Sequence, residues 1–154
     1  MYRLSLSTDW GAAMSTVRSA EVDSDLAISV ISPTKNYVHL SKDGVAKTIP
    51  GGEQFWSLST EQLDAYGYGW LVAEFVFEKD WANWEMHPEG DELVYVLSGE
   101  AQFLMECAQG VQIIHALAPA MIRVPCGVWH TAKIIQAGRF LHMTMGAGTQ
   151  SRPV

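Results

Sequence analysis

Glu92-Leu93-Val94-Tyr95-Val96-Leu97-Ser98-Gly99 is the stretch that decides the fold of this 154-residue chain. Its alternating β-branched, aromatic and aliphatic residues end at Ser-Gly, which is typical of a strand that runs into a tight turn. The alternation predicts that Glu92 faces inward together with Val94 and Val96, so that a carboxylate stands at the inner start of the strand. The opposite face then takes Leu93, Tyr95 and Leu97.

Short apolar runs continue on both sides of this stretch, separated by Gly, Pro, Asn and Asp. A single short helix is predicted at 60–66, where Ser59-Thr60-Glu61-Gln62 has the form of a capping box. Lys42-Asp43-Gly44 and Ser98-Gly99-Glu100 are turn signals between strands. Many short strands with almost no helix indicate an all-β sandwich or barrel. The predicted strands are 26–31, 37–40, 45–49, 54–58, 70–77, 93–97, 101–106, 111–117, 121–124, 130–135 and 139–145.

Length and charge narrow the classes of partner. The chain has the usual size of one domain, and no linker or repeat divides it. Its net charge of −7 and its lack of Lys/Arg clusters argue against nucleic acid and against an anionic membrane surface. No stretch approaches the ~20 apolar residues of a membrane span, and the first residues lack the apolar core of a secretion signal. Two cysteines, Cys107 and Cys126, predict reduced thiols in a cytoplasmic protein rather than a disulfide framework.

Two histidines and a carboxylate point to a metal site. His87 and Glu92 stand at the two ends of a short turn segment, and His130 closes Pro125-Cys126-Gly127-Val128-Trp129-His130. Two imidazoles and a carboxylate commonly hold a divalent first-row metal while leaving coordination positions free. Glu85 has the same parity as His87 and would face the same side of an extended segment. The competing interpretation of each residue is structural, such as an exposed turn histidine or a paired carboxylate at a strand end.

These residues resemble the two motifs of the cupin superfamily, and the resemblance covers about residues 70–146. The first motif is usually His-x-His, three or four residues, Glu, six residues and Gly; here it is 85–92 followed by Gly99. The second motif is usually Gly, five residues, Pro-x-Gly-x-x-His, three residues and Asn; here it is represented by 125–130. Three positions depart from the motifs: Glu85 replaces the first histidine, Pro119 the leading glycine and Ile134 the closing asparagine.

The resemblance implies a fold, a cofactor and an assembly. The fold is an all-β double-stranded β-helix, a jelly-roll barrel with few short helices, in which 1–154 form a single domain. Residues 1–69 would add further strands and, at 1–25, an N-terminal arm. The cofactor would be a divalent ion, manganese, iron, zinc or nickel, and the family-level expectation is a homodimer. Its ligands would be Glu85, His87, Glu92 and His130.

Glu85 has three possible roles under this resemblance. As a fourth ligand it would make the set two imidazoles and two carboxylates, which favours manganese or iron over copper. Without a bond to the metal it could serve as the general base. It could also form a hydrogen bond to a ligand histidine.

Three functions remain open at this point. The first is a divalent-metal-dependent enzyme, of dioxygenase or isomerase type, that acts on a small organic molecule. The second is a non-catalytic sensor that binds a small molecule or a metal. The third is a metal-free barrel that dimerises through its sheets.

The remaining notable side chains have structural interpretations beside functional ones. His39 and His115 are interpreted as packing or surface residues. His142 could line the same barrel, although a core or surface position is favoured, and Cys126 could be a reactive thiol, although a small buried turn residue is favoured. For the tryptophans an aromatic rim and packing alone are equally open: Trp81, Trp84 and Trp129.

Overall fold

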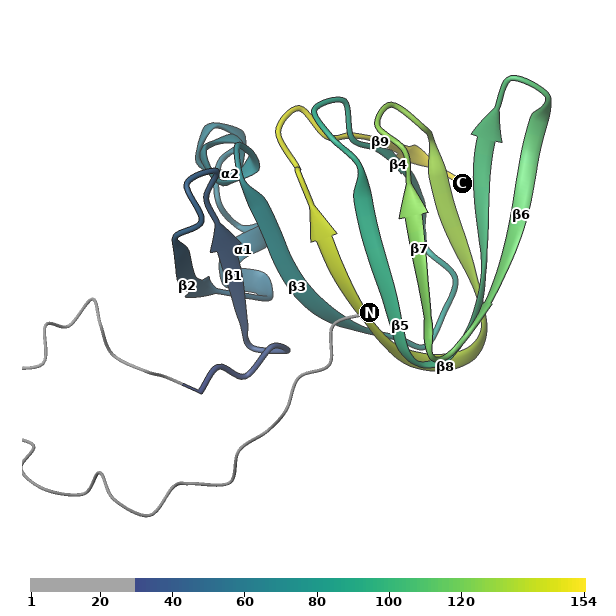
Figure 1. Ribbon diagram of the computed structural model, residues 1–154, viewed down its shortest axis with the longest axis horizontal. Coiled ribbons are helices and arrows are strands. Elements are labelled where there is room, and N and C mark those ends of the chain that lie inside the picture. The colour runs from purple at the N-terminus through teal and green to yellow at the C-terminus, as the bar shows by residue number, and fades with distance from the viewer. Residues whose placement is uncertain (1–29) are drawn as a thin grey trace, which may run out of the picture. The chain divides into compact units, whose positions relative to one another are not determined.

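Two long strands, β5 (Glu92–Cys107) and β8 (His130–Thr144), organise the fold. They pair antiparallel over almost their whole length, and their register is irregular between Val96 and Ala101. The computed structural model describes residues 30–154, and Figure 1 shows β5 and β8 turning together at its lower end. This bend divides each strand into two halves that belong to different sheets.

The remaining strands extend the two sheets from the halves of β5 and β8. The first sheet is built on Glu92–Val96 of β5 and the C-terminal half of β8, and the second on the other two halves. In order, the first sheet is β2 (Ala46–Pro50), β1 (Asn36–Leu40), β3 (Trp70–Phe77), β8, β5 and β7 (Ala120–Val124). The second is β9 (Gln150–Pro153), β4 (Asn83–Met86), β8, β5 and β6 (Gly110–Leu117).

The inward residues of both sheets form the main apolar core, and a second, smaller cluster lies around Tyr37 and Phe55. Val94, Val96, Phe103 and Phe140 are completely buried in the main core. Fully burying an apolar side chain of this size contributes roughly 1.5–3 kcal/mol, so the core is the main source of stability. Burial alternates along the first half of β5, as the sequence predicts: Glu92, Val94 and Val96 are buried, whereas the residues between them are not. The prediction of an all-β sandwich or barrel is confirmed.

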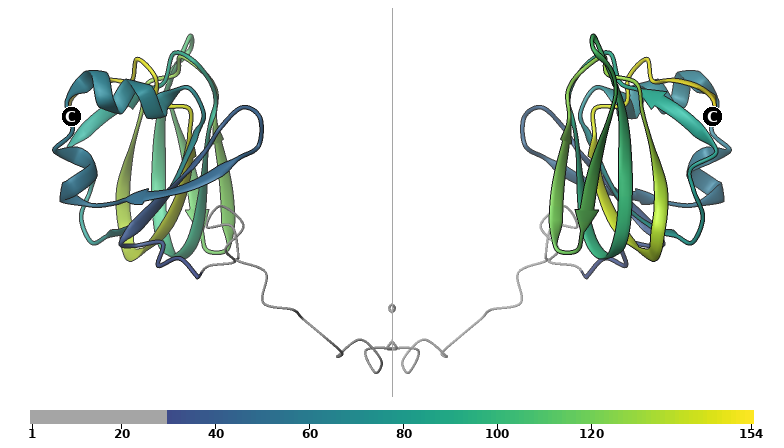
Figure 2. Two further views of the ribbon diagram at one scale, coloured as in Figure 1. Left: turned by 90° about the vertical axis from the view of Figure 1, so that its left-hand side faces the viewer. Right: turned by 90° about the vertical axis from the view of Figure 1, so that its right-hand side faces the viewer.

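Two short helices lie beside β3, α1 (Glu53–Trp56) and α2 (Thr60–Gly67), as Figures 1 and 2 show. The predicted capping box forms: Gln62 N donates to Ser59 Oγ at 3.3 Å, and Ser59 N donates to Gln62 Oε1 at 3.1 Å. These bonds satisfy amide groups at the helix start that have no partner within the helix. The predicted helix at 60–66 is therefore confirmed as α2.

The prediction of a strand at 54–58 is wrong, because this segment forms α1. Ser57 N donates to Glu53 O at 2.9 Å, which is a helical bond. Phe55 is buried by this turn and packs edge-on against Tyr37, with ring centroids 5.3 Å apart. A short apolar run has no periodicity long enough to separate a helical turn from a strand. Packing on Tyr37 decides the conformation here.

The predicted hairpin at Ser98-Gly99-Glu100 is also wrong, because β5 runs through it. Gly99 has a φ of +86° and faces Gly138 at the bend. A Cβ on Gly138 would lie 2.0 Å from Ser98 O, so the two strands approach more closely than any side chain allows. The bend also explains why the predicted strands 130–135 and 139–145 are one strand, β8. A Ser-Gly pair signals a change of direction, and here the change is a bulge rather than a reversal.

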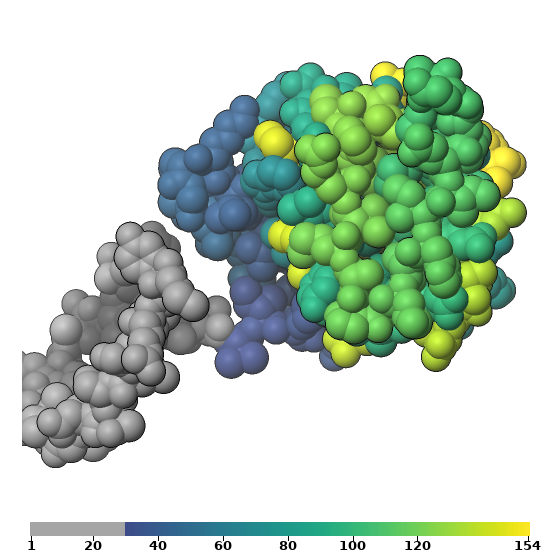
Figure 3. All heavy atoms as spheres, turned by 45° about the vertical axis from the view of Figure 1, so that its right-hand side comes forward, coloured from purple at the N-terminus to yellow at the C-terminus, as the bar shows by residue number. Residues whose placement is uncertain are grey.

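Apolar side chains also occur on the outer surface. Figure 3 brings the green strands β6 and β7 to the front, and the outward residues there include Val111, Ile113, Leu117 and Met121, all more than half exposed.

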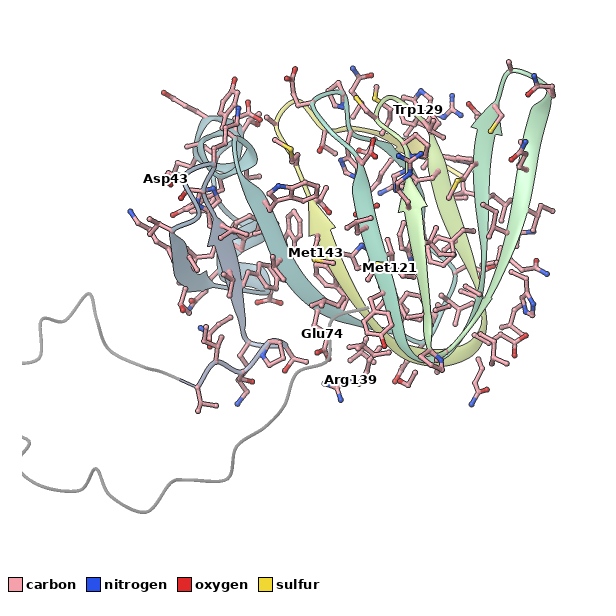
Figure 4. All side chains as sticks on the ribbon, in the orientation of Figure 1. Asp43, Glu74, Met121, Trp129, Arg139 and Met143 are labelled. Carbon is pink, nitrogen blue, oxygen red and sulfur yellow. The ribbon has the colours of Figure 1, made fainter. Side chains whose placement is uncertain are left out.

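At the bend, the buried Glu74 accepts a hydrogen bond from Arg139 Nε at 2.6 Å, and Figure 4 shows the two side chains together at the lower end of the strands.

Two further observations concern membrane-spanning segments and the N-terminal residues. No helix among residues 30–154 is long and apolar enough to cross a membrane. The predicted N-terminal arm at 1–25 lies outside the described residues, as does most of the strand predicted at 26–31.

Candidate metal centre and cavity

His87 follows β4 directly and is 5% exposed. Its Nδ1 lies 2.8 Å from Thr149 Oγ1, whose hydroxyl donates to Gly146 O at 2.7 Å. Because the hydroxyl proton is committed to the carbonyl, Thr149 accepts a hydrogen bond from the Nδ1–H of His87. In the neutral ring this leaves Nε2 with a free lone pair, which is the state that a metal ligand requires.

His130 is the first residue of β8 and is completely buried. Its Nδ1 lies 3.2 Å from Val128 O, to which it donates, so in the neutral ring its Nε2 also carries a lone pair. The turn before it is bonded to the first motif, because Gly127 N donates to His87 O at 2.9 Å. Gly127 has a φ of +75°, a conformation that favours glycine. The Pro-x-Gly turn therefore places the imidazole rings of His87 and His130 next to each other, with centroids 5.4 Å apart.

Glu92 begins β5 and is 3% exposed. Oε1 accepts hydrogen bonds from Thr144 Oγ1 at 2.6 Å and from His142 Nδ1 at 3.1 Å. Oε2 faces His130 Nε2 at 2.9 Å and His87 Nε2 at 3.7 Å. The carboxylate is thus fixed through one oxygen and presents the other to the two imidazoles.

The pKa values of Glu92 and His130 shift in opposite directions. Burial disfavours the charged form of Glu92, but the three surrounding imidazoles outweigh burial and hold its pKa well below the usual 4.5. Burial likewise disfavours the cation of His130, and the negative charge of Glu92 outweighs it, so the pKa of His130 is raised above 6.5. The carboxylate of Glu92 and the protonated form of His130 therefore stabilise each other.

His87, Glu92 and His130 form one buried cluster with the geometry of a metal site. One ligand atom from each lies within 4.8 Å of the others. His87 Nε2, Glu92 Oε2 and His130 Nε2 are all buried and have no aligned hydrogen-bond partner. Buried polar atoms are rarely left without a partner. Three unpartnered donor atoms converging on one point fit a divalent cation, and their chemistry suits zinc, manganese or iron.

Glu85 is the fourth predicted ligand and is not one of these three. Its backbone pairs with His130 in the β4–β8 ladder, and its half-buried side chain lines the cavity beside the cluster. Its negative charge adds to the raised pKa of His130, after the larger contribution of Glu92. Its predicted role as ligand or general base stays a prediction.

His142 belongs to the site, although its sequence context favours a core or surface role. It is 7% exposed, it orients Glu92, and it lines the same cavity. It stands opposite Val94 in the β5–β8 pairing, two residues along from Glu92. A prediction of this register from the sequence would have revealed it, but 130–145 was predicted as two strands.

A cavity of about 580 Å³ opens beside the cluster, and residues of both helices, β3, the segment 80–85, β5 and β8 line it. Six aromatic side chains contribute to its walls, among them Trp81, one of the three tryptophans considered for an aromatic rim. Trp84 and Trp129 instead lie on either side of Arg152, whose guanidinium is 4.4 Å from the Trp129 ring centroid. Figure 4 shows Trp129 at the upper end of the strands, away from the bend. A buried donor cluster at the side of an apolar cavity is a common form of ligand site.

Comparisons with known proteins find distant structural similarities and no sequence relative. No protein-family model matches the sequence, and no curated protein is similar enough to count as a relative. Among solved structures, an oxalate decarboxylase of Bacillus subtilis matches 56% of this chain at 16% identity, with a TM-score of 0.45. A cupin superfamily protein of Desulfitobacterium hafniense matches 50% at 22% identity and TM-score 0.43, and a cupin-2 protein of Shewanella frigidimarina 49% at 21% and 0.39.

These matches cover 23% of the oxalate decarboxylase and 67% of each of the two cupin proteins. Two sheets joined by bent strands bring a motif after β4 and a motif before β8 to one buried point. Within residues 70–146 the predicted all-β sandwich or barrel is therefore observed, with the two motif segments meeting at one buried point.

Proposed function

We propose that this protein is a divalent-metal-dependent enzyme of the cupin type that acts on a small organic molecule in the cavity. The observation that carries the proposal is the cluster of three buried, unpartnered ligand atoms at the side of a large apolar cavity. A purely structural role would account for the 2.9 Å contact between Glu92 and His130, but it would leave His87 Nε2 without a hydrogen-bond partner, at a cost in free energy.

The residues of the chain have separate tasks in this proposal. His87, Glu92 and His130 hold the ion, and Thr149, Thr144 and the Val128 carbonyl keep their side chains in the binding orientation. Glu85 completes the ligand set or takes a proton from the substrate.

The ion would supply Lewis acidity or a centre at which dioxygen is activated. The apolar walls exclude water, which strengthens the electrostatic interactions inside the cavity. Isomerase and dioxygenase activities are both compatible with such a centre.

Metal binding is the first test. The protein, purified without a histidine tag, is treated with chelator, incubated with Mn(II), Fe(II), Ni(II) or Zn(II), and its metal content is measured after desalting. We expect about one equivalent of ion in the wild type and a loss of it in His87→Ala and His130→Ala. His115→Ala is the matched control, because His115 is an exposed histidine of β6 that pairs with Glu100 and is not part of the cluster.

A wild type that holds no ion, or variants that keep it, would refute the proposed metal centre. If the ion binds, oxygen uptake and substrate isomerisation are then measured with a panel of phenols, diketones and hydroxy ketones. Metal-dependent turnover supports the enzyme, whereas binding of the panel without turnover favours the sensor.

A further inference from the structure

The cavity has a chemical character that limits what it can bind. We propose that it takes an uncharged aromatic molecule with a hydroxyl group, and that Trp81 and His142 hold this hydroxyl. This inference deepens the proposed function: only if the protein is the enzyme proposed above is the bound molecule its substrate. Three independent features of the cavity lead to it: its walls, its charge and two unpartnered polar atoms.

The walls favour a flat, apolar ligand. Six aromatic side chains contribute to them: Phe55, Trp56, Tyr66, Phe75, Phe77 and Trp81. Aromatic rings prefer edge-to-face or offset contact with other rings, and each such pair adds to the gain from burial. A volume of about 580 Å³ is ample for a ligand of one or two rings.

The charge of the lining disfavours anionic ligands. Asp64, Asp80 and Glu85 line the cavity together with Glu92, whereas no lysine or arginine is found in the lining among residues 30–154. A carboxylate or phosphate moved into such a site loses its hydration and meets like charges, with only the ion to offset them. An uncharged molecule avoids this cost.

Two buried polar atoms in the lining lack a partner, Trp81 Nε1 and His142 Nε2. The indole N–H can only donate. His142 donates its Nδ1–H to Glu92, so Nε2 of the neutral ring can only accept. The two rings are neighbours, with centroids 5.6 Å apart, and His142 is more than nine-tenths buried.

A hydroxyl group is the simplest ligand group that satisfies both atoms. Its oxygen accepts from Trp81, and its proton is donated to His142. A ketone could satisfy only Trp81, and a hydrocarbon neither. Because His142 also orients Glu92, the bound hydroxyl would lie next to the proposed metal ligand.

Equilibrium dialysis tests this inference with three probes of one shape: 2-naphthol, naphthalene and 2-naphthoate. The full chain is used both metal-free and metal-loaded, so that bonding to the ion is separated from binding to the lining. We expect 2-naphthol to bind the metal-free protein about tenfold more tightly than either of the other probes, the difference that one or two hydrogen bonds produce.

Two variants remove the polar atoms one at a time. Trp81→Phe keeps an aromatic ring without the N–H, and His142→Asn keeps a donor toward Glu92 without Nε2. Each is expected to weaken 2-naphthol about five- to tenfold and to leave naphthalene within about twofold. Trp84→Phe is the control, because Trp84 lies on the same segment outside the cavity lining.

The outcomes distinguish this inference from the proposed function. If 2-naphthoate binds the metal-free protein as tightly as 2-naphthol, or if both variants weaken naphthalene as much as naphthol, the inference is overturned. If the protein holds an ion but has no preference for 2-naphthol, the inference fails while the metal centre stands. A preference for 2-naphthol that both variants abolish supports the inference, even in a protein that binds no ion.

Discussion

Thr144→Val tests whether the hydrogen bonds around Glu92 prepare the metal site. The substitution keeps the shape of the side chain and removes the hydroxyl that donates to Glu92 Oε1 at 2.6 Å. A hydrogen bond to a charged group contributes about 1.5–3 kcal/mol, and His142 remains on the same oxygen, so we expect a loss near the lower end of this range. The metal-free protein should therefore be about 1.5 kcal/mol less stable in urea unfolding.

Metal affinity should also fall, because the freed carboxylate can turn its Oε2 away from the histidines. Loss of such an outer contact typically weakens metal binding 10–100-fold, and with one partner left we expect about tenfold. Isothermal titration of chelator-treated protein with the ion that binds at one equivalent gives the affinity.

Thr131→Val is the matched control for this experiment. Thr131 is a buried threonine of the same strand, and its hydroxyl donates to Asn83 O at 2.9 Å rather than to a metal ligand. Its replacement should cost about 1 kcal/mol of stability and leave metal affinity unchanged. If Thr144→Val keeps its affinity within about twofold, or if Thr131→Val weakens binding equally, Thr144 does not position Glu92 in the way we argue.

Three further predictions concern pH, the bend and the helix beside the cavity. Because the pKa of His130 is raised above 6.5, its stabilising contribution to the metal-free protein is complete below pH 6.5 and is lost as pH rises through the folded-state pKa. That of Glu92, whose pKa is lowered, is present above pH 4.5 and is lost only as pH falls through the folded-state pKa. Thermal unfolding in the presence of chelator should thus show a less stable protein at pH 8.5 than at pH 6. In a separate measurement without chelator, the stabilisation by added ion should be larger at pH 8.5 than at pH 6, since the ion competes with protons for the histidines. Gly138→Ala places a Cβ 2.0 Å from Ser98 O and should cost at least about 1–3 kcal/mol in urea unfolding. Ser59→Ala removes the cap of α2 and should cost about 1 kcal/mol by the same measurement.

Each of these predictions has its own control. His130→Asn should abolish most of the pH effect in the metal-free protein, and an unchanged pH profile would contradict the assignment to this residue. Gly146→Ala is the partner of Gly138→Ala, since a Cβ there meets nothing closer than 3.7 Å; equal losses at both positions would argue against a clash at the bend. Thr60→Ala, one residue beyond the cap, should leave α2 nearly as stable as before, and a loss equal to that of Ser59→Ala would show that the cap is not the cause.

The local elements that the sequence predicted correctly are those whose signal is contained in a few neighbouring residues. The capping box at Ser59 needs only the side chain three residues on, and β3 was predicted with its observed bounds, Trp70–Phe77, from a β-forming run that only Glu74 interrupts. The inward position of Glu92 likewise follows from the alternation along its own strand. Where a pattern within one segment determines the outcome, the sequence was sufficient.

The errors arise where a distant residue determines the local structure. Gly99 has the sequence signal of a hairpin, but Gly138 lies against it. The two glycines allow the paired strands β5 and β8 to approach closely at the bend and to continue beyond it. Phe55 has the signal of a strand residue, but the ring of Tyr37 holds it in a helical turn. Neither contact can be inferred before the strands are paired.

The same reasoning explains which part of the candidate site was found. His87, Glu92 and His130 lie within motifs that resemble those of the cupin superfamily, so their convergence was predicted from this resemblance, and the structure brings one ligand atom of each within 4.8 Å of the others. His142 lies in no motif, and only the register of β8 against β5 places it on the carboxylate of Glu92. The residues within the two motifs would determine which ion binds. Residues such as His142, which only the pairing of β8 with β5 brings to the site, would determine which molecule lies beside the ion. Substrate preference should therefore be altered by His142→Asn without loss of the ion, and a variant that loses both would show that the two tasks are not separate.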